Sequence, residues 1–434
     1  MNPILGVPYA LAARLAAAAA TAVPPGGGKL RRSIAARAGV VERVQAWARA
    51  HRSPTAPLVW IHAPSVGEGL MARPLLDRIR DARPDVQIAW TFYSPSAERF
   101  AAALGVDVAD YLPFDTEEAA TALLDALKPA VLVFSKLDVW PVLTEAAAAR
   151  RVKLALTSAT LAASSGRRGL FARALLRPAY AALDTVAAVH EADADRLVAL
   201  GVRRDRITVA GDTRYDQVWD RVRDSTTGAH RVVVARLSSN RFTVVAGSTW
   251  PGDEACIFDA WQAIRQAVPG ARLIIAPHEP EPAAVAALET RAVRTGVTAA
   301  RLDAATTDTD LIIVDRVGVL ADLYAIADVA YVGGGFHDAG LHSVVEPAAH
   351  GVPVLFGPKH EASRDAGLLL AADGGWSVDG PSAFSARTIT LATEPETRAR
   401  AGERARAVVQ SELGAADRAA ALVLPLLKPL RPSR

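Results

Sequence analysis

The chain has 434 residues, of which 51% are hydrophobic, and its 49 Lys and Arg against 46 Asp and Glu give a formal net charge of +3. This length predicts two domains, and the nearly balanced charge argues against a dedicated nucleic-acid binder. The single cysteine, Cys256, excludes a disulfide framework and a cysteine-rich metal site.

The first 50 residues combine an apolar stretch with a basic collar. Residues 4–23 are Ala-rich and interrupted by Arg14, and after a Pro/Gly run at 24–28 come Lys29, Arg31, Arg32 and Arg37. The charge follows the apolar stretch, whereas a secretory signal carries it before. About 20 apolar residues can span a bilayer, but Arg14 is costly at its centre. Residues 1–50 are therefore expected to anchor the protein to a membrane, as a span or as an interfacial helix. An ordinary helix packed on the domain is the alternative.

Short apolar runs then alternate with helical stretches. Strands are predicted over 58–63, 87–91, 130–134, 153–157 and 185–189, and helices over 71–82 and 95–104. Strands that alternate with helices indicate a parallel sheet with right-handed crossovers.

A second series of the same kind follows a polar break at 211–231. Its strands are predicted over 243–247, 272–276, 311–314, 329–332 and 352–356, and an Ala/Arg-rich helix is expected over about 394–427. Two such series predict an α/β protein with two Rossmann-like domains, 51–228 and 229–410, facing across a cleft as in B-type glycosyltransferases. Residues 411–434 are expected to form a C-terminal helix of the kind that crosses back onto the first domain.

The first candidate site follows the first predicted strand. Residues 60–69 read Trp-Ile-His-Ala-Pro-Ser-Val-Gly-Glu-Gly and open a helix. Gly67 permits close backbone approach beside Ser65, and Glu68 in the first helical turn is a candidate general base for a substrate hydroxyl. The structural alternative is an acid that favours the helix dipole.

Other polar residues of the first domain also follow predicted strands. Ser94 is a candidate cleft residue or part of a helix cap. Lys136 and Asp138 come directly after a strand, where Lys136 is expected either to hold an anionic substrate group or to pair with a carboxylate. Near the domain boundary, Arg214 is expected either to clamp a carboxylate or phosphate or to pair with a neighbouring Asp.

The loops of the second domain suit a nucleotide monophosphate. Ser248 and Thr249 end one strand, and His278 follows the next. After the strand at 329–332, three glycines including Gly334 form an unobstructed loop that can present backbone N–H groups to a phosphate. Ribose contact is expected from Glu346, one turn into the next helix. No metal-ligand set stands out, and the histidines are scattered along the chain.

These motifs resemble, in order, those of the transferases that attach 3-deoxy-D-manno-octulosonic acid (Kdo) to lipid A. Residues 62–68 are similar to the family signature His-Ala-x-Ser-x-Gly-Glu, and residues 111–115, Tyr-Leu-Pro-Phe-Asp, are similar to Tyr-x-Pro-x-Asp. Gly-Ser-Thr at 247–249, Pro-His at 277–278 and the glycine-rich stretch at 333–358 also fall in family order.

The resemblance implies an inverting transfer of Kdo from CMP-Kdo to a lipid A precursor in lipopolysaccharide core biosynthesis, at the cytoplasmic face of the inner membrane and without a catalytic metal. The first Rossmann-like domain would bind the acceptor and the second the CMP-sugar. The family base falls on Glu68. Donor-binding roles carry over to Ser248, Thr249, His278, Gly318, Gly334, His342, Ser343 and Glu346. Cleft or acceptor roles are expected for Ser65, Gly67, Ser94, Lys136, Asp138 and Arg214.

Several motifs depart from the common family pattern and point to a divergent branch. Residues 136–141 read Lys-Leu-Asp-Val-Trp-Pro in place of Glu-x-Glu-x-Trp-Pro. Residues 158–162 read Ser-Ala-Thr-Leu-Ala in place of Asn-Ala-Arg-x-Ser, Pro-His-Glu at 277–279 replaces Pro-Arg-His, and His-Ser at 342–343 replaces His-Asn. Two other functions stay open: a UDP-sugar transferase or epimerase of the same fold, and a membrane sugar-binding protein without activity.

Overall fold

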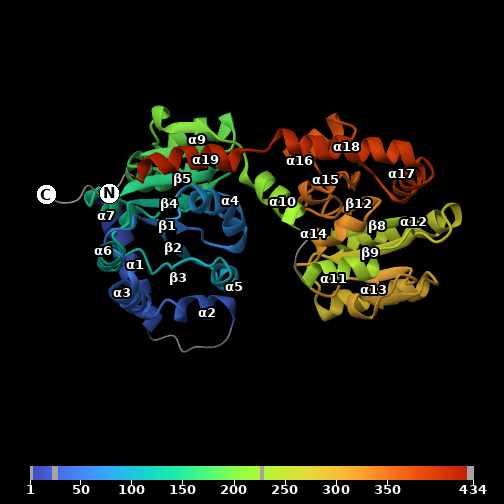
Figure 1. Ribbon diagram of the computed structural model, residues 1–434, viewed down its shortest axis with the longest axis horizontal. Coiled ribbons are helices and arrows are strands. Elements are labelled where there is room, and N and C mark those ends of the chain that lie inside the picture. The colour runs from blue at the N-terminus through green and yellow to red at the C-terminus, as the bar shows by residue number, and fades with distance from the viewer. Residues whose placement is uncertain (1–2, 22–27, 225–228, 428–434) are drawn as a thin grey trace. The chain divides into compact units, whose positions relative to one another are not determined.

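The strands form two parallel sheets in the computed structural model, which describes residues 3–21, 28–224 and 229–427 (Figure 1). Unit 1 comprises the residues up to Gln217 and those from Leu413 onward, and unit 2 comprises Val218–Glu412. The division falls within helix α10 (Thr213–Asp224). The Pro/Gly run at 24–27 and the polar stretch at 225–228 lie outside the described residues.

Unit 1 contains a seven-stranded sheet in the order β3-β2-β1-β4-β5-β6-β7. All its neighbouring strands are parallel, and β1, β4 and most of β5 are buried and largely apolar, as expected of strands covered on both faces. Its strands are β1 (Leu58–His62), β2 (Gln87–Phe92), β3 (Val108–Tyr111), β4 (Val131–Ser135), β5 (Lys153–Ala159), β6 (Thr185–Ala188) and β7 (Ile207–Val209).

Helices cover both faces of this sheet, with α6 and α7 on one face and α4 and α5 on the other (Figure 1). The helices of unit 1 besides the start of α10 are α1 (Pro3–Thr21), α2 (Lys29–Ala35), α3 (Val40–His51), α4 (Val66–Ala82), α5 (Glu98–Ala102), α6 (Glu117–Leu127), α7 (Pro141–Ala149), α8 (Leu170–Ala181), α9 (Glu191–Leu200) and α19 (Ala415–Val423).

Unit 2 repeats this architecture with a parallel sheet in the order β10-β11-β9-β8-β12-β13-β14. Its strands are β8 (Thr243–Thr249), β9 (Arg272–Pro277), β10 (Ala299–Arg301), β11 (Leu311–Ile313), β12 (Val329–Val332), β13 (Val354–Phe356) and β14 (Gly375–Ser377). Its helices after α10 are α11 (Ala229–Leu237), α12 (Pro251–Ala267), α13 (Pro282–Arg294), α14 (Leu320–Leu323), α15 (Val345–Ala349), α16 (Arg364–Ala371), α17 (Pro381–Thr393) and α18 (Pro395–Ser411).

The C-terminal segment differs from the single helix predicted over about 394–427. Gly414 adopts a left-handed backbone conformation, with φ of 90°, and separates α18 from α19. A left-handed residue cannot continue an α-helix, and glycine adopts this conformation without a steric penalty. Helix α19 packs against α4 and β6 of unit 1.

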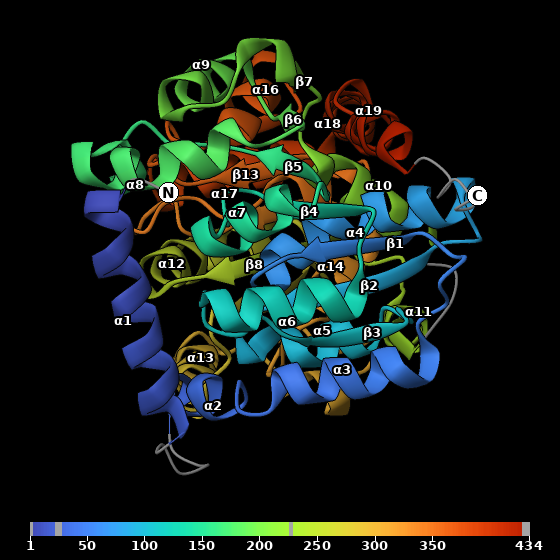
Figure 2. The ribbon, with the colours of Figure 1, turned by 90° about the vertical axis from the view of Figure 1, so that its left-hand side faces the viewer.

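The apolar N-terminal segment forms α1, which packs on unit 1 and contacts α8 and α2 (Figure 2). The Tyr9 hydroxyl donates a 2.9 Å hydrogen bond to the buried Asp115, and Arg14 pairs with Glu118 at 2.6 Å. Within the described part of the chain, no helix has both the length and the hydropathy needed to cross a membrane.

Candidate active site

Glu68 and Lys136 meet where the strand order of the first sheet reverses. Strands are added in one direction from β1 to β3 and in the other from β4 to β7, so the reversal lies between β1 and β4. Open parallel sheets bind ligands beyond the carboxyl ends of the strands at such a point. Glu68 follows β1 in the first turn of α4, and Lys136 directly follows β4. Lys136 Nζ lies 3.3 Å from Glu68 Oε1.

Both carboxylate oxygens of Glu68 accept a hydrogen bond. Ser65, the N-cap residue of α4, donates its hydroxyl to Oε2, while Lys136 donates to Oε1. Burial raises the pKa of Glu68, but the Ser65 hydrogen bond and the Lys136 charge outweigh burial and bring this pKa below its ordinary value. Gly67 lies between the two motif residues in the same helical turn. The result is an ionised carboxylate, 18% exposed, that can accept a proton from a hydroxyl group.

The backbone that presents Lys136 is in a conformation that side-chain-bearing residues seldom adopt. Lys136 has φ of 66°, and its N–H donates to the Thr157 carbonyl of β5 at 2.8 Å. Ser158, next on β5, has φ of 51°, and its hydroxyl lies 2.8 Å from that of Thr213. Left-handed residues other than glycine gather at functional sites, where neighbouring contacts hold them.

A buried histidine connects the first signature to the loop after β4. His62 is fully buried, with Nδ1 3.0 Å from Thr91 Oγ1 and Nε2 3.2 Å from Asp138 Oδ2. Thr91 Oγ1 also accepts from Trp60 Nε1 at 2.9 Å, and Trp140 Nε1 lies 3.2 Å from His62 Nε2 and 3.1 Å from Asp138 Oδ2. Burial raises the pKa of Asp138, but the hydrogen bond and charge of His62 reverse the effect and lower this pKa.

The remaining expected residues of unit 1 are held by local contacts. Ser94 belongs to the same sheet edge, because its N–H donates to the Pro64 carbonyl at 2.8 Å, and its hydroxyl accepts from the Ser96 N–H as a helix cap. Arg214 pairs with Asp212 at 2.6 Å. Ser94 therefore serves as a helix cap, and Arg214 pairs with a neighbouring Asp.

Unit 2 has its own reversal point, between β8 and β12. Ser248 and Thr249 end β8, and Ser248 is again left-handed, with φ of 53°. A Cβ atom on Gly333 would lie 2.3 Å from the Ser248 carbonyl oxygen, so only glycine fits after β12. Gly334 is left-handed, with φ of 97°. The glycines at this point therefore allow two strand-end loops to touch.

A buried carboxylate, Asp253, ties these loops together. It accepts hydrogen bonds from the N–H groups of Trp250 and Gly334, each at 2.9 Å, and from the Tyr331 hydroxyl at 2.7 Å. Sequence reasoning did not select Asp253 as a site residue. Asp253 lies three residues after Trp250, the N-cap of α12, where an acid ordinarily caps the helix.

Aromatic rings from three loops gather beside Asp253. The expected donor residues His278 and His342 stack with ring centroids 4.4 Å apart, and Trp250 Nε1 donates to His342 Nε2 at 3.1 Å. Burial lowers the pKa of His342, and the neighbouring His278 lowers it further. The sequence motifs did not single out Trp250 or the adjacent His337 as site residues.

The other expected donor residues lie near α14 and α15. Gly318 is left-handed, with φ of 92°, and its carbonyl accepts from Arg221 at 3.2 Å. Burial raises the pKa of Glu346 in α15, although the charge of Arg221 opposes this effect. Ser343 is exposed beside His342. Among the residues that the structure describes, no three His, Cys, Asp or Glu side chains are placed to hold a metal ion.

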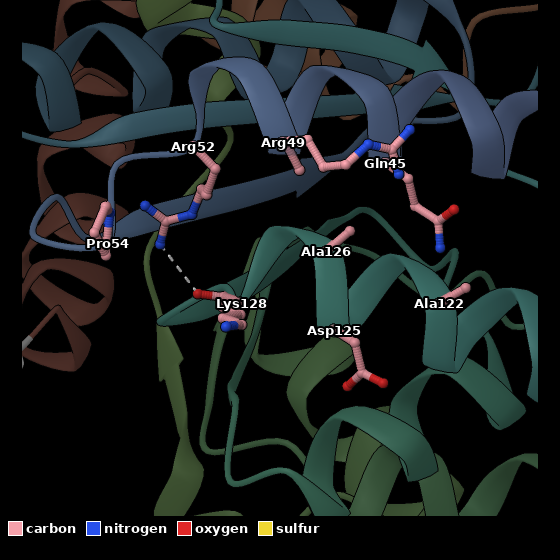
Figure 3. Close-up of a pocket in the computed structure, with 9 residues that line it drawn as sticks. Gln45, Arg49, Arg52, Pro54, Ala122, Asp125, Ala126 and Lys128 are labelled. Atoms are coloured by element: carbon pink, nitrogen blue, oxygen red, sulfur yellow. Dashed lines mark hydrogen bonds between the residues drawn. The ribbon is translucent and has the colours of Figure 1, made fainter.

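A separate surface groove of about 830 Å³ lies between α3 and α6 (Figure 3). Arg52 there donates to the carbonyls of Leu127 at 2.7 Å and Lys128 at 3.3 Å, and so joins the ends of the two helices. The groove contains none of the strand-end residues described above; its lining is Gln45, Ala48, Arg49, Arg52, Pro54, Ala122, Asp125, Ala126 and Lys128.

Comparison with known proteins places this arrangement in a family. The family model described as 3-deoxy-D-manno-octulosonic-acid transferase matches residues 33–217. A 3-deoxy-D-manno-octulosonic acid transferase of Bordetella pertussis is 32% identical over 388 residues, with 84% of this chain and 86% of the relative covered. One of Haemophilus influenzae is 27% identical, with 86% of each covered.

The fold is shared more widely. The crystal structure of UDP-GlcNAc 2-epimerase from Neisseria meningitidis bound to UDP-GlcNAc matches with a TM-score of 0.62 at 13% identity, covering 85% of this chain and 99% of that one, which shows a common fold alone. Similarity in sequence along most of its length shows that the chain belongs to the 3-deoxy-D-manno-octulosonic acid (Kdo) transferase family and is a glycosyltransferase.

Proposed function

We propose that this enzyme transfers Kdo, or a related acidic sugar, from a CMP-activated donor to a hydroxyl group of a lipid A precursor, with Glu68 as general base. The observation that carries the proposal is the ionised Glu68 carboxylate at the reversal point of the first sheet, between Ser65 and Lys136. Its position in the family signature and the names of the Kdo transferase relatives support the same reading.

In the proposed reaction, Glu68 takes the proton of the acceptor hydroxyl while the hydroxyl oxygen attacks the anomeric carbon. The bond from that carbon to the CMP phosphate oxygen breaks, and CMP leaves with the electron pair. A single displacement from the opposite face inverts the anomeric centre. The proposal includes no metal: imidazole groups at His278 and His342 stabilise the charge that develops on the leaving phosphate.

An apolar surface of unit 1 supports a lipid acceptor. Leu170 and Phe171 at the start of α8 are 83% and 81% exposed. Helix α1, which contacts α8, exposes a stripe at i, i+4 and i+8, formed by Val7, Leu11 and Leu15. We define these five residues as the α1/α8 patch.

Basic residues next to the α1/α8 patch suit an anionic membrane. Arg167, Arg168 and Arg173 precede or lie within α8, and Arg167 is 3.6 Å from Asp138 in the loop after β4. Exposed apolar groups with basic neighbours favour an anionic lipid surface. We propose that the enzyme works at the cytoplasmic face of the inner membrane, with α1 at the interface and the lipid acceptor delivered toward Glu68.

The direct test is incubation with CMP-Kdo and a lipid A precursor, with measurement of released CMP and of the lipid product by mass spectrometry. We expect the lipid to gain sugar units. Glu68→Gln should still bind CMP but turn over about 10²- to 10⁴-fold more slowly, the range that a general base contributes. The control is Glu117→Gln, an exposed acid in the first turn of α6, which should keep full activity. Absence of CMP release by the wild type would contradict the proposed function. Full activity of Glu68→Gln would contradict the role of Glu68 as general base and leave the proposed reaction standing.

A further inference from the structure

Three imidazoles and an indole form a stack in unit 2. Trp250 stacks on His337, with centroids 4.0 Å apart and planes 9° apart, and on His278, at 4.9 Å and 22°. His278 in turn stacks on His342 at 4.4 Å. We call these four residues the histidine stack. They come from the loops after β8, β9 and β12, at the reversal point where a phosphate is expected to bind.

Two of the imidazoles are held neutral by their hydrogen bonds. His342 Nε2 accepts from Trp250 Nε1 at 3.1 Å, and His337 Nδ1 accepts from the Ala339 N–H at 3.0 Å. A ring nitrogen that accepts a hydrogen bond carries no proton, so neither ring is an imidazolium in this arrangement. The burial that lowers the pKa of His342 acts in the same direction.

His278 is the member of the stack that can accept a proton. Its side chain is exposed, and within the described residues its ring nitrogens make no hydrogen bond. The face of Trp250 lies under the ring, and an indole face stabilises a cation within about 6 Å. Because His337 and His342 are neutral, no adjacent positive charge opposes protonation of His278.

The charged groups near the stack in the described part of the chain include a buried carboxylate, an ion pair and an exposed acid. Asp253 faces the stack from α12, where it accepts the N–H groups of Trp250 and Gly334. Lys359, from the loop after β13, forms an ion pair with Asp338. Glu279 is the exposed neighbour of His278 in the chain. A phosphate that binds here therefore adds negative charge beside these carboxylates, and that charge favours a proton on His278.

We propose that His278 takes up a proton when the phosphate of the nucleotide donor binds, and that the Trp250 face holds the resulting imidazolium against that phosphate. The inference rests on the proposed CMP-activated donor. It makes donor affinity pH-dependent: binding is coupled to proton uptake, so CMP affinity falls as pH rises, by up to about tenfold per pH unit for one proton. His278 would also keep its positive charge beside the phosphate as CMP departs.

Calorimetric titration of the full chain with CMP at pH 7.5, in two buffers with different ionisation enthalpies, measures this uptake. At that pH the CMP phosphate is already a dianion, because its second pKa is about 6, so CMP has no phosphate proton to release when it binds. We expect the apparent enthalpy to depend on the buffer, with up to one proton bound per CMP. Cytidine, which lacks the phosphate, should show no such dependence.

Variants separate the proton acceptor from the binding site. His278→Gln keeps a hydrogen-bonding side chain, so CMP should still bind, several-fold more weakly, with identical heats in both buffers. Trp250→Phe keeps a ring but is a weaker cation partner, and should reduce both proton uptake and affinity. His51→Gln, an exposed histidine beside Trp47 in unit 1, should leave proton uptake unchanged. CMP binding by the wild type with equal heats in both buffers would overturn this inference alone. No CMP binding at all would overturn the proposed donor and the inference with it.

Discussion

Replacing Lys136 with methionine should make Glu68 a base that works only at higher pH. The Nζ–Oε1 separation is 3.3 Å. At this distance, opposite unit charges attract by about 1.3 kcal/mol in a water-like dielectric and about 5 kcal/mol at an effective dielectric constant of about 20. Because 43% of the Lys136 side chain is exposed, water screens the pair, and we take the lower end, about 1–2 kcal/mol. Lys136 lowers the pKa of Glu68, so its removal raises this pKa.

The assay is the pH dependence of kcat/KM for CMP release, whose acid limb reports ionisation of the free enzyme's base. An interaction of about 1.4 kcal/mol corresponds to a tenfold change in proton affinity, so the acid limb of Lys136→Met should move upward by roughly one pH unit. Lys136→Arg keeps the charge and should leave the limb in place. Lys128→Met is the matched control, because Lys128 is also a left-handed lysine of unit 1, at the C-cap of α6. An unmoved limb in Lys136→Met, or an equal shift in Lys128→Met, would refute the reasoning.

Three further predictions concern stability and membrane binding. A Cβ on Gly335 would lie 2.5 Å from backbone atoms of Gly357, so Gly335→Ala should lower the free energy of unfolding in urea by about 1–3 kcal/mol; unchanged unfolding would show that the loops can separate at no cost. Asp253→Asn replaces an acceptor oxygen with an N–H₂ group facing a donor, which should cost about 1–3 kcal/mol in the same assay, whereas a stability equal to wild type would mean that Asp253 does not tie the loops. Phe171→Asp should reduce co-sedimentation with anionic vesicles about tenfold or more, since burial of such a side chain contributes about 1.5–3 kcal/mol; an equal loss in Val293→Asp, an 80% exposed position of unit 2, would contradict the α1/α8 patch.

The central strands were predictable from sequence and the edge strands were not. All five strands predicted in each series exist, because runs such as Leu58 to Ile61 are apolar and fully buried. The four strands that sequence reasoning missed, β3, β7, β10 and β14, are the outermost strands of the two sheets. Edge strands are short and partly exposed, so they lack the apolar run on which recognition depends.

Some residues of the candidate site were likewise predictable from sequence, and others were not. Loops that follow central strands place Glu68 and Lys136, so pattern and position identified both side chains, and the structure adds the ion pair between them. Asp253 and His337 act through contacts with residues from other loops, and these contacts depend on which strands are neighbours. Strand order is a property of the tertiary fold, and one sequence does not reveal it.

At Gly414 the chain has passed from unit 2 back into unit 1, and this affects folding during synthesis. Ala419 and Val423 of α19 belong to the hydrophobic core of unit 1. Asp216, nearly 200 residues earlier, accepts hydrogen bonds from the N–H groups of Gly414 and Ala416 at 2.8 and 3.0 Å. Because the ribosome releases the chain from its N-terminus and domains tend to fold as they emerge, unit 2 can fold while unit 1 still lacks its last core helix. The unit that is synthesised first is thus completed last, and until then the surface of α4 that receives α19 stays available to chaperones and to aggregation.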